Sequence, residues 1–284
     1  MPRQPLEFYK SQGIDAKSTL NDSARRLLQE YANIKDDDEM YLHVDKCCEE
    51  AFKVAPYPCI GMVQFLDLSL QSMTSIYPEI LDRVKKNGKF LDLGCCLGQE
   101  IRQLVFDGAP SSNTYGSDLW GDFFEVGYKL FNDKDRLQTT FIAADIFDDG
   151  SQLVTELAGK VDIIYTGAFF HLFTLDEQER AAARVVQLLA PKPGSLIVGR
   201  QSGGEEAREE ERKGNTGGKK YFKHNAQSWK ELWKRVGETT GTRWSVEADV
   251  NLPEYGLSGV AEGKSVEIQN KMQARGLRYV IRRV

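Results

Sequence analysis

Three carboxylates in this sequence stand within or just beyond short apolar runs. Asp92 lies in the run Phe90 to Leu93, and Asp118 and Asp145 end or follow two later runs of the same kind. In a doubly wound parallel sheet the carboxyl ends of the strands meet at one edge, and ligands bind there. A carboxylate at that edge can accept hydrogen bonds from ribose hydroxyls or from an exocyclic amine. The three positions therefore predict a site for an adenosine-like ligand.

The first of these runs ends in a glycine turn. Gly94 and Gly98 stand four residues apart, and an amphipathic pattern of Ile101, Leu104 and Val105 follows at once. This order predicts a strand, a tight turn and a helix. Glycine lets the backbone approach a ligand closely, and the first N–H groups of the helix point into the crevice. The same order also occurs in α/β proteins whose turn binds nothing, so the prediction rests on the turn and the acids together.

The ends of the fourth and fifth predicted strands supply groups that could face a substrate. His171 lies just past the fourth strand, where it could orient a carboxylate by a hydrogen bond or take the proton of a phenol. The alternative is that His171 caps the following turn. Arg200 could steer an acid group or could be a surface residue. The substrate-facing candidates are Phe169, Phe170, Arg200 and Gln201.

From residue 89 onward the pattern alternates between strands and helices. Alternation of this kind predicts a parallel sheet covered on both faces. Two strand-like runs with no helical pattern between them close the chain, which predicts an antiparallel pair at the end of the sheet. The predicted strands are 89–94, 113–118, 138–144, 161–166, 195–201, 243–250 and 276–284, and the predicted helices are 99–107, 120–132, 151–158, 175–189 and one from about residue 226.

Residues 1–87 precede this series and predict an N-terminal helical cap. The first 20 residues show no sustained period and indicate an arm. Helical spacing begins after Asn21, a candidate N-cap, and a second helix is expected over about 37–52. Aromatic residues of the cap could form the wall of a lipophilic pocket, although Tyr31 and Tyr41 fit a core role better.

The segment 202–220 is glycine-rich and densely charged, so it can contribute little to a core. We expect a mobile loop here, acting either as a lid or as a solvated loop without a role.

Composition excludes several classes of protein. The chain has 284 residues, 41% of them hydrophobic, which suffices for a sizeable core. The net charge of −5 and the lack of a Lys/Arg-rich block argue against a nucleic-acid partner. No run approaches the ~18 apolar residues of a membrane span, and the start lacks the apolar region of a signal peptide. We therefore expect a soluble, cytoplasmic protein.

The five cysteines make a poor disulfide framework and suit a reducing compartment. His43, Cys47, Cys48 and Cys59 could be imagined as zinc ligands, but their spacing fits no common zinc pattern. Cys47 and Cys48 also lie on an apolar stripe, so buried small side chains are the better interpretation. No metal is expected.

The order of these elements resembles that of the class I S-adenosylmethionine-dependent methyltransferases, over about residues 88–284. The resemblance implies a Rossmann-like α/β fold whose seven-stranded, mostly parallel sheet ends in an antiparallel pair, with S-adenosyl-L-methionine as the cofactor. It also implies that the glycine turn packs the methionine part, that Asp118 binds the ribose and that Asp145 accepts from the adenine amine. The family usually has a third glycine where Cys96 stands. The implied cofactor residues are Asp92, Gly94, Cys95, Gly98, Asp118, Leu119, Asp145, Ile146, Thr166 and Gly167.

A closer resemblance is to the small fungal methyltransferases of meroterpenoid pathways. It is carried by Leu-Gly-Cys-Cys-Leu-Gly-Gln-Glu at 93–100, Phe-Asp-Gly-Ala-Pro at 106–110 and Tyr-Gly-Ser-Asp-Leu at 115–119. The resemblance implies a lipophilic acid substrate, the farnesylated aromatic polyketide of such a pathway, whose carboxylic acid becomes a methyl ester. A phenol of another secondary-metabolite pathway is the alternative nucleophile.

Two other classes stay open at this point. A nicotinamide-dependent oxidoreductase normally carries G-x-G-x-x-G, whereas this turn is G-x-x-x-G. A methyltransferase fold that has become a binding module has only Cys96 in its favour, because the acids at 92, 118 and 145 are intact. Apolar faces on the N-terminal helices could also serve a homodimer.

Overall fold

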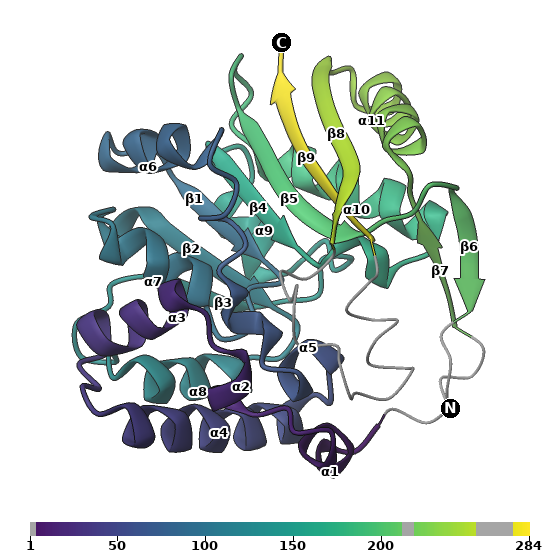
Figure 1. The fold of residues 1–284 in the computed structure, drawn as a ribbon. Coiled ribbons are helices and arrows are strands. Elements are labelled where there is room, and N and C mark those ends of the chain that lie inside the picture. Colours follow the sequence, from purple (N-terminus) through teal and green to yellow (C-terminus); the bar gives the residue numbers. More distant parts are fainter. Residues whose placement is uncertain (1–3, 212–218, 254–274) are drawn as a thin grey trace.

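A seven-stranded sheet forms the centre of the computed structural model, which describes residues 4–211, 219–253 and 275–284 (Figure 1). The strand order is β3-β2-β1-β4-β5-β9-β8, with β1 to β5 parallel and β9 antiparallel to both of its neighbours. This confirms the predicted sheet. The strands are β1 (Phe90–Leu93), β2 (Thr114–Asp118), β3 (Thr140–Ala143), β4 (Ile163–Gly167), β5 (Leu196–Ser202), β8 (Trp244–Pro253) and β9 (Arg275–Arg283).

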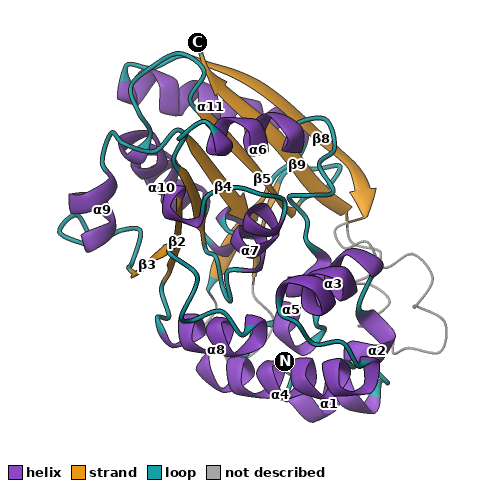
Figure 2. Ribbon diagram, turned by 90° about the vertical axis from the view of Figure 1, so that its left-hand side faces the viewer, coloured by secondary structure: helices purple, strands orange, loops and turns teal. Residues whose placement is uncertain are grey.

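Helices cover both faces of the sheet because successive strand side chains point to opposite faces. Leu91 and Leu93 of β1 belong to the hydrophobic cluster that includes α9, α10 and α11, whereas Phe90 belongs to the cluster of α6 and α7 (Figure 2). The helices lie within a few residues of their predicted bounds. They are α6 (Tyr77–Lys85), α7 (Gln99–Phe106), α8 (Asp122–Phe131), α9 (Gln152–Leu157), α10 (Leu175–Leu188) and α11 (Ala226–Thr240).

The N-terminal residues form short helices where the sequence predicts an arm. Tyr9 of α1 is buried, and the Ala16 N–H at the start of α2 donates to Asp45 (2.9 Å). These helices are too short to show a period in the sequence, so the prediction of an arm is wrong. Asn21 caps α3 as predicted. The elements are α1 (Leu6–Ser11), α2 (Ala16–Thr19), α3 (Asp22–Arg26), the π-helix η1 (Leu27–Tyr31), α4 (Asp37–Val54), α5 (Pro58–Gly61) and the 3₁₀ turn η2 (Gln64–Asp67).

These N-terminal elements pack on α8 and share one hydrophobic cluster with it. Figures 1 and 2 both show α1, α4 and α8 together at the end of the molecule opposite the C-terminus. Tyr31 and Tyr41 are buried in this cluster, as predicted. The predicted homodimer stays a prediction. In the part of the chain that is described, no helix combines the length and apolarity needed to cross a lipid bilayer.

The segment 202–220 contains a strand where the sequence predicts a loop. β6 (Arg208–Glu211) pairs antiparallel with β7 (Lys220–Lys223), and residues 212–218 lie outside the described residues. Lys220 lies opposite Glu211 in this ladder and forms a 2.7 Å ion pair with Glu209, its diagonal neighbour. The Phe222 N–H of β7 donates to the Phe173 carbonyl (2.9 Å), which joins the hairpin to the segment after β4. The predicted mobility of this segment stays a prediction.

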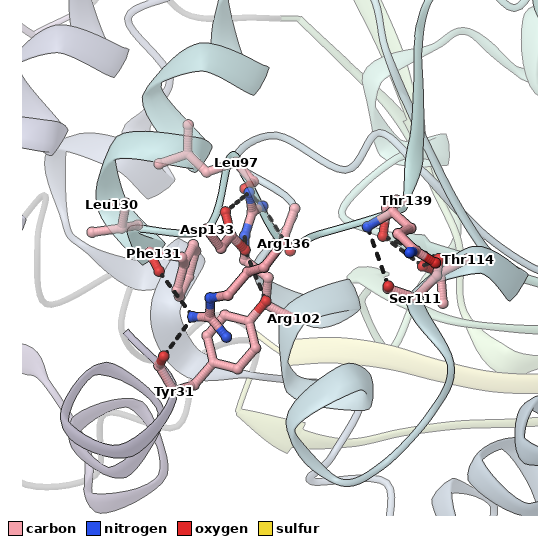
Figure 3. Close-up of polar contacts among 12 residues, drawn as sticks. Tyr31, Leu97, Arg102, Ser111, Thr114, Leu130, Phe131, Asp133, Arg136 and Thr139 are labelled. Atoms are coloured by element: carbon pink, nitrogen blue, oxygen red, sulfur yellow. Dashed lines mark hydrogen bonds and ion pairs between the residues drawn. The ribbon is translucent and has the colours of Figure 1, made fainter. Parts of the chain in front are cut away.

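A buried ion pair ties the glycine turn to the N-terminal cap (Figure 3). Nε and Nη2 of Arg102 donate to Asp133 Oδ2 and Oδ1 at 2.7 and 2.9 Å, and both side chains are fully buried. Nη1 of Arg102 donates to the carbonyls of Leu97 and Gly98 at 2.6 and 3.3 Å. The Tyr31 hydroxyl donates to Asp133 Oδ2 (2.8 Å). The cap, the turn and the end of α8 therefore share one hydrogen-bonded cluster.

We predict that Arg102→Met lowers the free energy of unfolding by about 3–5 kcal/mol, because it leaves the Asp133 carboxylate buried without its cation. Urea unfolding followed by circular dichroism measures this change. The control is Lys134→Met, which removes the exposed partner of Glu125 and should leave the unfolding midpoint unchanged. A midpoint for Arg102→Met equal to that of the wild type would contradict the role of the pair.

Candidate active site

A cavity of about 430 Å³ lies at the carboxyl ends of the parallel strands. Its volume falls within the ~300–1,000 Å³ of typical small-molecule sites. The N-terminal cap contributes to its wall through Tyr57 and Phe65, two of the aromatic residues that the sequence suggests for a pocket. The predicted site residues that line it are Asp92, Gly94, Asp118, Leu119, Asp145, Ile146, Gly167, Phe169, His171 and Arg200.

The glycine turn between β1 and α7 has the backbone shape that the sequence predicts. Gly94 has φ +80°, and a Cβ there would stand 3.0 Å from the Phe169 ring. Gly98 has φ +69°, and a Cβ there would stand 2.7 Å from Arg102 Nη1. The N–H groups of Gly94 and Cys95 both donate to the Ser117 carbonyl, at 2.8 and 3.0 Å. Gly98 and the buried Cys95 are not among the lining residues, so they contribute to the conformation of the turn without facing the cavity.

Cys96 occupies a position that favours glycine. Its φ of +51° lies in the left-handed region, which explains why a third glycine suits this place in the related motif. The Cys96 N–H donates to Asp118 Oδ2 (2.9 Å), and the Trp120 N–H donates to Asp118 Oδ1 (3.2 Å). Burial raises the pKa of Asp118, and these amide donors oppose that effect. Two backbone donors therefore fix the carboxylate at the end of β2.

Leu119 and Asp145 lie at the outer side of the cavity. Leu119 is 54% exposed, and Asp145 accepts a hydrogen bond from the Phe147 N–H (2.9 Å) beside the buried Ile146. The Trp120 ring N–H donates to the Tyr57 hydroxyl (3.0 Å). The segment just before α8 and the N-terminal cap therefore meet beside the cavity. An exposed acceptor next to apolar side chains suits an adenine ring, whose amine donates while its faces pack.

Besides Cys95 and Gly98, three predicted site residues do not line the cavity. The Thr166 hydroxyl is hydrogen-bonded to the Tyr279 hydroxyl (2.6 Å), and Phe170 packs on Trp229 with 5.3 Å between ring centroids. Gln201 is buried next to Arg200. Because side chains alternate along a strand, the lining residues Gly167 and Arg200 face the cavity and their neighbours Thr166 and Gln201 face away from it. Thr166 and Phe170 are therefore packing residues in this structure.

His171 lies in the 3₁₀ turn η4 (Phe170–Leu172), and its ring reaches the neighbouring strand β5. His171 Nδ1 accepts a hydrogen bond from the Ser202 N–H (3.3 Å). A neutral imidazole that accepts at Nδ1 carries its proton at Nε2. The tautomer set by Ser202 is therefore one that donates a hydrogen bond from Nε2.

The sequence prediction missed a group of polar lining residues. Glu100 is 4% exposed, and both of its carboxylate oxygens accept from the Leu70 N–H at 3.2 Å. Burial raises its pKa to about 7, while the Arg200 charge opposes that shift. Burial, and then the Glu100 charge, raise the pKa of Asp92. The sequence signal for Glu100 was an acidic residue directly before the apolar residues of α7. Gln64, Ser69, Gln99 and Ser117 belong to the same group.

The residues of the cavity fit S-adenosylmethionine. The Asp118 carboxylate can accept hydrogen bonds from ribose hydroxyls, and the Asp145 carboxylate can accept one from an exocyclic amine. At Gly94 no Cβ stands between the backbone and the cavity. Buried polar atoms of Asp92, Gln64 and Gln99 that face the same cavity have no hydrogen-bond partner in the described chain. Such atoms are expected where a polar ligand binds.

Comparison with known proteins gives the family. Residues 8–66 match the family described as meroterpenoid methyltransferase N-terminal domain. The chain is similar to methyltransferase adrK of Penicillium roqueforti, with 44% identity over 87% of this chain and 90% of the relative. The chain belongs to the fungal meroterpenoid methyltransferase family. It is an S-adenosylmethionine-dependent methyltransferase.

Two further relatives cover most of the chain. The O-methyltransferase phiE of a fungal species is 43% identical over 83% of this chain and 80% of its own length. The asnovolin E/chermesin D methyltransferase nvfJ of Aspergillus novofumigatus is 42% identical over 91% of this chain and 94% of its own. Family membership rules out the nicotinamide-dependent alternative.

The zinc alternative gains no support from the structure. Within the described residues, no group of three or more His, Cys, Asp or Glu side chains could hold a metal ion. Cys47 and Cys48 are buried in the hydrophobic cluster of the cap, which confirms their interpretation as packing residues.

We predict that Asp118→Ala weakens the binding of S-adenosylhomocysteine by more than about tenfold, because it removes both the ribose acceptor and the acceptor of the Cys96 N–H. Isothermal titration calorimetry measures the affinity. The exposed Asp135→Ala serves as the control and should bind like the wild type. Wild-type affinity in Asp118→Ala would remove this residue from the cofactor site.

Proposed function

We propose that this enzyme transfers a methyl group to the carboxylate of a farnesylated aromatic polyketide and so forms a methyl ester in fungal meroterpenoid biosynthesis. The observation that carries the proposal is the combination of a cation with largely apolar walls. Arg200 is the only Lys or Arg among the described lining residues of the cavity. The apolar lining outside the adenine region suits a lipophilic chain and ring, and includes Phe65, Phe147, Phe169, Leu172 and Phe173.

The bound cofactor supplies an electrophilic methyl group, so the protein has to position a nucleophile and exclude water. Positioning of this kind contributes roughly 7–11 kcal/mol to lowering a barrier. A carboxylate needs no general base at neutral pH, because its pKa near ~4 lies well below 7. The Arg200 guanidinium is suited to hold a carboxylate by charge-assisted hydrogen bonds. It would orient the acid, while aromatic side chains cover the rest of the substrate.

The tautomer of His171 favours an acid over a phenol as the substrate. With Nδ1 accepting from Ser202, the ring donates from Nε2 and can hold a carboxylate oxygen. A base for a phenol would need an unprotonated Nε2, so the ring would have to carry its own proton on Nδ1 and would lose the hydrogen bond from the Ser202 N–H. The residues present therefore support methyl ester formation better than methyl ether formation.

The substrate class is tested with a matched pair of compounds, a farnesylated hydroxybenzoic acid and its decarboxylated phenol. We expect the enzyme to add one methyl group to the acid only, and mild alkaline hydrolysis followed by mass spectrometry should release it. The rate should stay flat between about pH 6 and 9, because the nucleophile is already ionised. A product that resists hydrolysis, or equal methylation of the phenol, would show that the nucleophile is a phenol.

We predict that His171→Ala lowers turnover of the acid while the affinity for S-adenosylhomocysteine stays unchanged, because His171 positions the substrate. His171→Gln keeps a side-chain N–H donor and should retain more turnover than His171→Ala. Steady-state rates combined with calorimetry separate the two effects. If His171→Ala turned over the acid at the wild-type rate, His171 would have no part in the reaction.

A further inference from the structure

Four buried side chains that line the cavity, those of Gln64, Asp92, Gln99 and Ser117, carry polar atoms without a partner in the described chain. The Ser117 hydroxyl can either donate or accept a hydrogen bond, so only the other three have a fixed role. Their atoms are Gln64 Nε2, Asp92 Oδ2 and Gln99 Oε1, and these three residues are 3%, 2% and 9% exposed. All three residues line the same cavity. Buried polar atoms are almost always hydrogen-bonded in native proteins, so four exceptions at one cavity point to a polar ligand group.

The three atoms differ in kind, and together they match one chemical group. The Asp92 carboxylate and the Gln99 carbonyl oxygen accept hydrogen bonds, whereas the Gln64 amide nitrogen donates them. An α-amino acid presents the complement, an ammonium group that donates and a carboxylate that accepts. Neither the adenine nor the ribose of the cofactor offers this pair of opposite charges. The arrangement therefore suits the amino-acid end of the cofactor.

The segment that carries Gln64 is strained at both ends. Val63 and Leu68, which flank η2, have φ +56° and +50°, in the left-handed region. A β-branched residue rarely adopts this conformation, because its side chain is crowded against the backbone there. Strained backbone is retained where the surrounding structure holds it, often at ligand sites. The strain supports a role for the turn that begins at Gln64.

Glu100 links the segment after η2 to helix α7. Its two carboxylate oxygens accept from the Leu70 N–H, two residues after the strained Leu68. Glu100 directly follows Gln99 at the start of α7, and α7 itself follows the glycine turn. Gln64 from the cap and Gln99 from the methyltransferase core are therefore held in a fixed relation across the cavity.

We propose that Gln64 donates a hydrogen bond to the carboxylate of the cofactor's amino-acid end, opposite the ammonium-binding oxygens of Asp92 and Gln99. Gln64 is then a specificity residue supplied by the N-terminal cap, and the cap completes the cofactor site as well as the substrate wall. This inference rests on the assignment of the cavity as the S-adenosylmethionine site.

The test compares two ligands that share the nucleoside and differ in the amino-acid end. S-adenosylhomocysteine has this end, and 5′-methylthioadenosine lacks it. By calorimetry, Gln64→Leu should weaken S-adenosylhomocysteine about tenfold or more, as expected for a hydrogen bond to a charged group, and leave 5′-methylthioadenosine within about twofold. Gln64→Glu should weaken S-adenosylhomocysteine further, because two carboxylates would then face each other. Asp118→Ala is the matched control and should weaken both ligands.

Three results would overturn the proposal, and they differ from one another. Unchanged affinity of Gln64→Leu for S-adenosylhomocysteine would show that Gln64 makes no contact with the ligand. An equal loss for both ligands, accompanied by a lower melting temperature, would show that Gln64 only supports the fold. Binding of neither ligand by the wild-type protein would reject the cavity as the cofactor site, which is a separate failure from that of Gln64.

Discussion

The arrangement of the glycine turn between β1 and α7 depends on one buried cation. Arg102 neutralises Asp133 and also donates to the carbonyls of Leu97 and Gly98, so a single guanidinium satisfies the turn and the end of α8 together. A buried ion pair contributes little net stability, because the cost of removing two charges from water offsets most of their attraction. The pair instead fixes the position of the glycine turn relative to α8. The glycine turn cannot shift without leaving a charge or a carbonyl unsatisfied.

The close packing around this ion pair has its own requirement. A Cβ on Gly127 of α8 would stand 2.4 Å from the Leu97 carbonyl oxygen, so only glycine allows α8 to approach the turn. Tyr31 of the π-helix η1 joins the same cluster from the N-terminal cap. The cap and the glycine turn are therefore hydrogen-bonded to the same ion pair, so a shift in one of them disturbs the other.

Much of this architecture could be predicted from the sequence because the signals are local. Apolar runs and helical periods gave the order of strands and helices, and Asp118 and Asp145 could be placed because they follow strands. Thr166 and Gln201 could not be placed, because a central strand is apolar on both faces and its sequence does not reveal which side chains point to the cavity. Gln64 and Glu100 were missed for another reason. Their roles depend on a strained turn and on a contact between segments 30 residues apart along the chain.

The place of β9 has a consequence for how the chain acquires its structure during synthesis. β9 lies between β5 and β8 and pairs with both, although it is the last of these strands to be made. Until residues 275–283 have left the ribosome, β5 is an edge strand with side chains that the finished sheet buries. The unpaired backbone N–H and C=O groups of an exposed edge strand can pair with other chains. The glycine turn and its ion pair can therefore assemble early, but the nascent protein can aggregate until β9 is inserted.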